Sequence, residues 1–429
     1  MGDYQLRHLA DNSVFPAEYD LFLTSSPSNR LNSEFNLLKA GLFRTEYTAK
    51  KLTVQPKMPG LFRYIDWLPV QKHVLTTACS VTFQNKEVSD YLSLPNLWFT
   101  FTGWSPEHAC YSKTGSFKEL EAYPTFSRLS NSNQTVVVSS VGNTGRAFAQ
   151  AAAELDRNVI LVIPKNEIGR IWTVQPTGNN VKLLTVSGDY ADAIHVSEKI
   201  CSLPGFISEG GAKNVARRDG MGTVMLNAAT TVGRLPDKYF QAVGSGTGGI
   251  SAWEASLRLI EDGRFGSHLP ELHLIQNKPF TPMENAWNSH RRQILDNDLS
   301  NSAHSIQSVY ASVLTNRSPP YGIIGGVFDA MTECGGNISS VDNNKARQAF
   351  QMFEEFENGL DLDPAAAVAF AALIDAVENK TVCSADVIFL NLTGGGYTRI
   401  KEDFGHIPIQ DFQNVSPDVT IDELKEVLS

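Results

Sequence analysis

Short runs of apolar residues alternate with segments of helical spacing through the middle of the chain. The runs TVVVSSV (135–141), NVILVIP (158–164) and VKLLTVSG (181–188) predict buried strands. The segments after the first and third runs, NTGRAFAQAAAELD and DYADAIHVSEKICSLP, carry apolar residues three or four positions apart, which predicts helices. Alternating strands and helices predict a parallel sheet with right-handed crossovers.

A second series of the same kind begins at KYFQAVGSGTGG (238–249), a strand that runs into a glycine-rich turn. A helix (250–263) and the strand LPELHLIQN (269–277) follow, and further helices are expected at 281–296 and 344–357. The segment 363–379 begins with Asp and Pro, as a capped helix does, and 385–396 predicts a strand that ends in three glycines. The two series predict a small α/β domain, 125–235, inserted in a large one formed by 1–124 plus 236–429.

Composition supports a globular protein of two domains, because 429 residues exceed what one ordinary core holds. The net charge of −10 argues against nucleic-acid binding, although it allows an anionic substrate to meet a local basic cluster. No apolar run approaches the roughly 18 residues of a membrane helix, and the first residues lack the basic and apolar pattern of a secretion signal. We therefore expect a cytoplasmic protein that binds no membrane.

The cysteines predict no metal site and no disulfide framework. All five are far apart, and none forms a CxxC pair, so reduced thiols are expected at Cys79, Cys110, Cys201, Cys334 and Cys383. Residues 1–40 contain no cysteine, so ordinary packing must hold this segment. Its expected anchors are Leu6, Phe15, Tyr19, Leu21 and Phe22.

Three segments with chemistry stand out, and each has an alternative interpretation. In SSVGNTG (139–145), Asn143 starts a helix, as in any strand-to-helix turn. GSGTGG (244–249) can wrap a phosphate with successive N–H groups. It also fits the spacing of a dinucleotide site, but no acidic residue ends a second strand about twenty residues later. In TGSFKELEA (114–122), Lys118 is either a nucleophile or an exposed helix lysine.

The order of these segments resembles the fold-type II enzymes of pyridoxal 5′-phosphate, the tryptophan synthase β group. The resemblance implies two open parallel-sheet α/β domains with the active site between them. It places Lys118 on the lysine that holds the cofactor as a Schiff base, and Asn143 on the residue that hydrogen-bonds the cofactor's phenolic oxygen. Thr393, in NLTGGG, falls on the hydroxyl residue that faces the pyridine nitrogen, although it can also be a plain strand-end residue. The phosphate-binding loop falls on Gly244, Ser245, Gly246, Thr247, Gly248 and Gly249.

Within this superfamily the chain resembles the threonine-synthase-like branch, and inside it the archaeal cysteate synthases. The segments KTGSFKELEAYPT (113–125), EGGAKNVARRDGMGTVML (209–226) and YFQAVGSGTGGISAWEASLRLIEDGRFGS (239–267) carry the resemblance. It implies a β-replacement in which sulfite displaces the phosphate of O-phospho-L-serine and gives L-cysteate, with Lys118 moving the Cα proton. One departure is the absence of the cysteine-rich N-terminal segment of many relatives.

The alternatives are a threonine synthase-like or other β-elimination or replacement enzyme, a cofactor-holding protein without catalysis, and a dinucleotide oxidoreductase. The partners expected are a small anionic amino acid, a small nucleophile such as sulfite, and further copies of the chain, since homo-oligomers are usual in this family. Arg146 is either a substrate ligand or a surface cation. The residues predicted to bind substrate are Lys113, Thr114, Ser116, Arg146, Lys213, Arg217 and Arg218.

Overall fold

Two parallel sheets hold the predicted strands in the computed structural model, which describes residues 3–17, 41–70, 72–130, 132–300 and 302–428. The larger sheet has six strands in the order β15-β14-β13-β16-β5-β4, and only β4 runs antiparallel to its neighbour. Its strands are β15 (Gly336–Val341), β14 (Glu271–Asn277), β13 (Lys238–Ala242), β16 (Ile388–Leu392), β5 (Leu97–Phe101) and β4 (Val81–Phe83).

Helices cover both faces of the larger sheet, as a parallel sheet requires. Alternate strand residues face opposite sides: Phe240 and Leu390 pack with one set of helices, and Tyr239 and Phe389 with the other. The first set is α1 (Lys86–Leu92), α10 (Asn343–Phe356) and α11 (Pro364–Glu378). The second is α5 (Val215–Val232), α6 (Thr247–Asp262), α7 (Pro282–Asn288) and α9 (Val327–Cys334).

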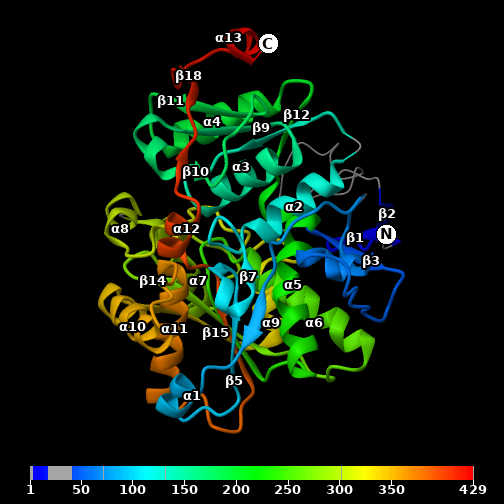
Figure 1. Cartoon of the computed structure of the whole chain (residues 1–429), viewed down its shortest axis with the longest axis vertical. Coiled ribbons are helices and arrows are strands. Elements are labelled where there is room, and N and C mark those ends of the chain that lie inside the picture. The colour runs from blue at the N-terminus through cyan, green and yellow to red at the C-terminus, as the bar shows by residue number, and fades with distance from the viewer. Residues whose placement is uncertain (1–2, 18–40, 71, 131, 301, 429) are drawn as a thin grey trace.

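The smaller sheet has five parallel strands in the order β12-β8-β9-β11-β18 and lies above the larger one in Figure 1. One face packs against α2 (Glu119–Arg128) and α3 (Asn143–Leu155), and the other against α4 (Tyr190–Cys201) and α13 (Ile421–Leu428). The strands are β12 (Phe206–Ser208), β8 (Thr135–Val138), β9 (Val159–Pro164), β11 (Val181–Val186) and β18 (Asp411–Val415). Two parallel sheets with helices on both faces confirm the predicted fold class.

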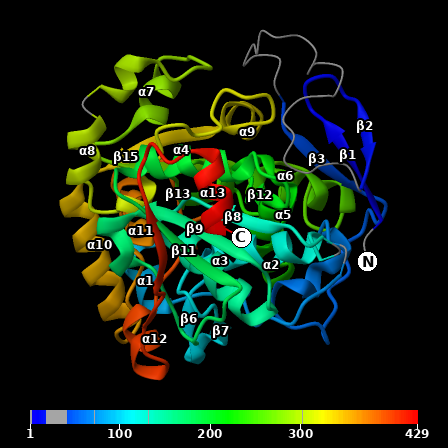
Figure 2. The ribbon, with the colours of Figure 1, turned by 90° about the horizontal axis from the view of Figure 1, so that it is seen from above.

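The C-terminal part of the chain differs from the predicted division, which placed it with the large domain. After α12 (Tyr397–Asp403) the chain leaves the larger sheet and adds β18 to the edge of the smaller one, parallel to β11 (Figure 1). Figure 2 shows this C-terminal segment in red between α12 and α13. Before that, β17 (Ile407–Pro408) pairs with β10 (Trp172–Thr173). At the other end of the division, α2 crosses the expected boundary at residue 125. Apart from these differences, the insertion of 125–235 remains a proposal.

The N-terminal residues form a small antiparallel sheet in the order β2-β1-β3 that packs beside α5 and α6 (Figure 1). Its strands are β1 (Tyr4–His8), β2 (Val14–Pro16) and β3 (Phe43–Tyr47). Leu6 is buried and Phe15 packs against the same core, as expected of anchors. The other expected anchors, Tyr19, Leu21 and Phe22, lie outside the described residues.

Most predicted elements appear with ends moved by a few residues, and one helix is much shorter than predicted. The segment expected to be helical over 281–296 gives only α7, because His290 takes a left-handed φ of 52° that no helix accommodates. The predicted cap of α11 is confirmed, since the Asp363 side chain accepts a hydrogen bond from Ala365 N. The remaining short elements are β6 (Trp104–Ser105), β7 (Cys110–Tyr111) and α8 (Ser302–Ser308).

Helices α2 and α5 cross at very short range, and this contact fixes the start of α2. Pro124 lies inside α2 and has no N–H, so the carbonyl of Leu120, four residues earlier, lacks its usual helical partner. That carbonyl faces Gly220 of α5, where an added Cβ would lie 1.8 Å from the Leu120 oxygen. Only glycine allows this approach, and the residues at the start of α2 are thereby set beside α5.

Candidate active site

Lys118 stands where the chain enters α2. It is the residue that precedes the first full turn of that helix, and its side chain is only 20% exposed. Its Nζ lies 2.6 Å from Oε1 of Glu121, one helical turn further on, and 4.7 Å from the centre of the Phe117 ring. The side chain is therefore held at a specific place and is not an exposed helix lysine.

The glycine turn after β16 lies directly against the segment that leads to Lys118. Phe117 N donates to the carbonyl of Thr393 at 3.0 Å, and Gly395 N donates to the carbonyl of Gly115 at 2.9 Å. An added Cβ on Gly394 would lie 2.6 Å from the Gly115 oxygen, so the two backbones can approach this closely only without side chains there. Thr393 and Lys118, distant in sequence, become neighbours through these backbone contacts.

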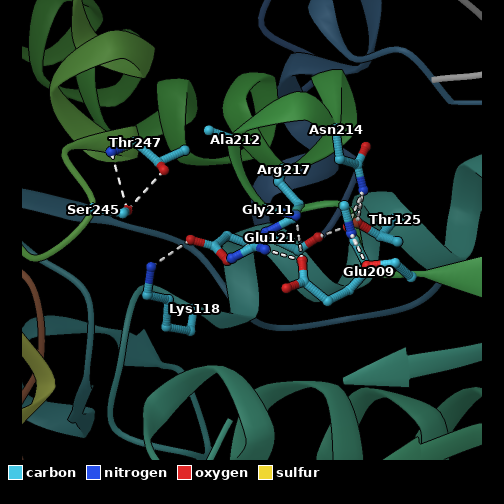
Figure 3. A network of polar contacts seen from close by, with 12 residues as sticks. Lys118, Glu121, Thr125, Glu209, Gly211, Ala212, Asn214, Arg217, Ser245 and Thr247 are labelled. Atoms are coloured by element: carbon cyan, nitrogen blue, oxygen red, sulfur yellow. Dashed lines mark hydrogen bonds and ion pairs between the residues drawn. The ribbon is translucent and has the colours of Figure 1, made fainter. Parts of the chain in front are cut away.

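The glycine-rich loop 244–249 connects β13 to the first turn of α6. Gly246 has a φ of +79° and turns the chain into the helix, so that the first amides of α6 have no partner within it. The hydroxyls of Ser245 and Thr247 lie 2.8 Å apart, close to these amides (Figure 3). An added Cβ on Gly248 would meet Gln241 at 2.1 Å. Free amides, hydroxyls and the helix dipole make a fitting site for a phosphate group.

Asn143 begins α3 and reaches across to the larger sheet. Its Nδ2 donates to Oδ2 of Asp363 at 3.0 Å, and the Tyr397 hydroxyl donates to the same oxygen at 2.7 Å. Arg146 donates to the Asn143 amide oxygen, and its guanidinium lies over the rings of Trp172 and Tyr397. Burial raises the pKa of Tyr397, and the neighbouring Asp363 carboxylate raises it further. These contacts join the start of α3, on the smaller sheet, to Asp363, the N-cap of α11 on the larger sheet.

Arg217 and Arg218, both predicted to bind substrate, are occupied by buried carboxylates. Arg217 lies between Glu121 and Glu209, with its Nε 2.8 Å from Oε2 of Glu121 (Figure 3). Arg218 is 1% exposed, and its Nε lies 3.0 Å from Oε2 of Glu254, on α6. Consecutive residues of a helix point in different directions, so the two guanidinium groups serve different ion pairs.

The other residues predicted to bind substrate lie around the segment 112–118 or on the surface. Lys113 Nζ pairs with Glu154 at 2.7 Å, and the Thr114 hydroxyl donates to Glu119 at the same distance. Ser116 Oγ accepts from Lys118 N at 3.3 Å. Lys213 is exposed. The structure thus brings Lys113, Thr114 and Ser116 to one loop, while Lys213 lies outside it.

Glu119 contacts this loop through Thr114 and is buried. Burial raises the pKa of Glu119 to about 7, although its hydrogen bonds from Thr114 lower that pKa.

Ser139 follows β8 and leads to the start of α3. Its buried hydroxyl has no hydrogen-bond partner among the described residues, and neither has Nε of Arg146. Free donors next to a helix N-terminus fit a small anion.

Comparisons with known proteins show the family of the chain. Residues 108–394 match the family described as pyridoxal-phosphate dependent enzyme. The cysteate synthase of Methanocorpusculum labreanum is 54% identical over 405 residues, which are 94% of this chain and 95% of that protein. The cysteate synthase of Methanosarcina acetivorans is 48% identical over 99% of this chain and 100% of its own length. This chain belongs to the cysteate synthase family of pyridoxal-phosphate-dependent enzymes.

Solved structures of more distant proteins share the fold of this cysteate synthase family member. Threonine synthase from Escherichia coli aligns with a TM-score of 0.57 and 13% identity, covering 99% of both chains. Maize serine racemase aligns with a TM-score of 0.56 and 16% identity, covering 76% of this chain and 93% of its own. At these identities the likeness concerns the fold.

Membership of the family makes the chain a pyridoxal-phosphate enzyme of β-replacement, and the side chains at the site fit that cofactor. The cofactor needs three groups: an amine, which stands at the start of α2, a hydroxyl, which stands at the end of β16, and a set of amides for its phosphate, which stands at the start of α6.

None of the helices that the structure describes is long and apolar enough to cross a bilayer. Within the same residues, no group of three or more His, Cys, Asp or Glu side chains could hold a metal ion.

Sequence reasoning missed four residues of the site. Glu121 had a usable signal, because it follows Lys118 by three positions on a predicted helix. Asp363 was interpreted only as a helix cap, and its contacts with Asn143 and Tyr397 connect segments far apart in the chain. Glu209 and Tyr397 had no local signal at all.

Proposed function

We propose that the protein makes L-cysteate from O-phospho-L-serine and sulfite and releases phosphate. The observation that carries the proposal is the similarity of 54% and 48% identity to cysteate synthases over nearly the whole chain. The bond between Cβ and the phosphate oxygen breaks, and the leaving phosphate keeps the electron pair. The sulfur lone pair of sulfite forms the new bond to Cβ, so no oxidant or reductant is required.

Lys118 is the residue proposed to hold the cofactor and to move the proton at Cα. Pyridoxal phosphate, when bound, supplies the electron-withdrawing ring that makes this proton removable. Lys118 Nζ takes the proton as an uncharged amine and returns it to Cα after sulfite has added. The position of Lys118 beside the turn of Thr393 supports this assignment, because both then contact one ring.

The remaining cofactor contacts are assigned in the same proposal. Residues 244–249 bind the phosphate group, and Asn143 contacts the phenolic oxygen. Thr393 faces the pyridine nitrogen with a neutral hydroxyl, which does not protonate it. Negative charge then stays nearer Cα, which favours expulsion of a group from Cβ over transamination.

The anionic substrate needs donors that are not already bound to carboxylates. The start of α3, with the unpartnered hydroxyl of Ser139 and Nε of Arg146, offers such donors. Arg217 and Arg218 contact substrate only if they leave their carboxylates, which is costly for buried charges. We therefore propose Arg146 and Ser116 as the first candidates among the predicted residues. Lys113 and Thr114 already contact Glu154 and Glu119, and Lys213 is exposed on the surface, so these three come second.

The test measures three reactions of the purified protein. Phosphate release from O-phospho-L-serine should depend on sulfite and should yield L-cysteate in equal amount. O-phospho-L-homoserine without sulfite is the competing substrate, and a higher kcat/KM for threonine formation would instead assign a threonine synthase. A cofactor absorbance that no amino acid alters would assign a protein without catalysis.

Lys118→Ala is the matched variant for this test. It should lose turnover and the visible absorbance of lysine-bound cofactor, because no neighbouring amine reaches the same place. A borohydride-stable cofactor adduct elsewhere at the site would refute the role of Lys118.

The proposal also includes assembly into a homo-oligomer and a location in the cytoplasm. Analytical sedimentation tests the first, and cell fractionation tests the second.

A further inference from the structure

Four charged side chains stand in line at the start of α2 with alternating sign. Lys118 Nζ contacts one carboxylate oxygen of Glu121 at 2.6 Å, and Nε of Arg217 contacts the other at 2.8 Å. Arg217 also pairs with Glu209, whose carboxylate accepts from Gly211 N at 2.7 Å. Figure 3 shows the row running from Lys118 to Glu209 beneath α5.

Glu121 is the most enclosed member of this row. Its side chain is 0% exposed, so water cannot stabilise its charge. Burial by itself would raise the pKa of Glu121, but the positive charges of Arg217 and Lys118 and their hydrogen bonds keep it below its ordinary value. The group is therefore a carboxylate at neutral pH, and its two oxygens have separate partners.

Lys118 needs such a partner because of where it stands. The start of a helix carries partial positive charge, which disfavours an ammonium group there. The groups that face its Nζ are the Phe117 ring and Glu121 from α2, with Arg217 behind Glu121 on α5. Glu209 balances Arg217 and is itself near Tyr190 and Cys201 of α4. Among the described residues, Glu121 is the negative group in direct contact with the lysine.

We propose that Glu121 is a positioning residue for Lys118, which stabilises and orients its ammonium group whenever the lysine is free of cofactor. Arg217, balanced by Glu209, holds the Glu121 carboxylate in place. The inference rests on the proposed role of Lys118. It adds that a buried carboxylate one turn away orients the lysine's ammonium group.

The direct test is the pH dependence of cofactor capture by the apoprotein. Only the uncharged amine attacks the aldehyde carbon of pyridoxal phosphate, so the capture rate rises with pH around a midpoint. In Glu121→Gln the ammonium loses its partner while Arg217 remains nearby. The midpoint should move to lower pH, because the ammonium form has lost its direct negative partner. Capture near neutral pH should become faster even though turnover falls.

Glu209→Gln is the matched control. It removes a carboxylate from the same row and the same arginine, but it does not contact Lys118. A general loss of order in the row would shift the midpoint equally in both variants. The proposal instead requires a clear shift in Glu121→Gln and a smaller one in Glu209→Gln, because Glu209 acts on the lysine only through Arg217 and Glu121. Equal midpoints in wild type and Glu121→Gln would overturn it.

Two further variants keep the test decisive. If Glu121→Gln does not fold, Glu121→Asp should shift the midpoint in the same direction by a smaller amount, because its carboxylate is one methylene shorter. An unchanged midpoint there counts against the proposal. Lys118→Ala separates the two levels of inference, since borohydride trapping uses the cofactor alone. Capture by Lys118→Ala would refute the proposed role of the lysine, whereas loss of capture with an unshifted Glu121→Gln would refute only the role of Glu121.

Discussion

The crossing of α2 and α5 predicts opposite effects for two similar substitutions in one helix. Gly220→Ala places a Cβ 1.8 Å from the Leu120 carbonyl oxygen and 2.8 Å from the ring of Pro124. An ordinary carbon–oxygen contact is about 3.3 Å, so the helices must separate by about 1.5 Å. Gly222→Ala, on the same helix, meets Ala255 and Ser251 at 3.4 Å, which is an ordinary contact.

The expected magnitudes follow from these distances. Alanine is favoured over glycine within a helix by about 0.5–1 kcal/mol, which both variants gain. Overpacking costs up to about 3 kcal/mol, and a backbone carbonyl cannot turn away, so Gly220→Ala should lose about 2 kcal/mol net. For a domain of this size that lowers the melting temperature by about 4–8 °C, whereas Gly222→Ala should raise it by about 1–4 °C.

The assay is thermal unfolding of the cofactor-free proteins at one scan rate, followed by titration with pyridoxal phosphate. Because α2 begins at Lys118, its displacement should also weaken cofactor binding in Gly220→Ala and leave it unchanged in Gly222→Ala. If both variants melt together at or above the wild-type temperature, α2 and α5 do not approach as closely as described.

Three other substitutions test the surroundings of the site. As pH rises from 5 to 8, Glu119→Gln should become more stable relative to wild type, by up to about 3 kcal/mol. The reason is that wild type loses stability as pH rises through the raised folded-state pKa of Glu119, about 7, whereas glutamine does not ionise. A difference in melting temperature that stays constant over this range would contradict the prediction. Tyr397→Phe removes a buried hydrogen bond to Asp363 and should cost about 1.5–3 kcal/mol in urea unfolding, so an unchanged midpoint would mean that the bond does not form. Thr393→Asp should keep the cofactor and increase side products, because a carboxylate there would stabilise the protonated form of the pyridine nitrogen. Product analysis decides this last case, and a wild-type ratio would show that Thr393 does not face that nitrogen.

The buried strands were predictable because each is a continuous apolar run between polar turns. Strand β18 was not, since the residues DFQNV of an edge strand are mostly exposed and have no such run. The early end of α7 depends on the backbone of His290, which apolar spacing does not report.

Candidate site residues could be predicted from the sequence where they lie in local motifs, whereas contacts that form across the fold gave no sequence signal. Lys118, Asn143 and the loop 244–249 each stand at a strand-to-helix or loop-to-helix junction with a glycine signal. Asn143 and Asp363 are 220 positions apart, and Arg217 and Glu121 are 96 apart. The adjacent Arg217 and Arg218 remain predicted substrate ligands, but two of the carboxylates that they contact, Glu121 and Glu254, lie far from them in sequence, so these contacts are visible only after folding.

The edge strand β18 is translated long after β11, the strand with which it pairs. Thr185 of β11 hydrogen-bonds Asp411, which the ribosome adds 226 residues later. During synthesis this edge of β11 therefore stays unpaired while β13, β14, β15 and β16 of the larger sheet are translated. Such an edge can pair with another nascent chain, and long-range pairing slows folding. The smaller sheet can therefore be completed only near the end of translation, when β18 has been made.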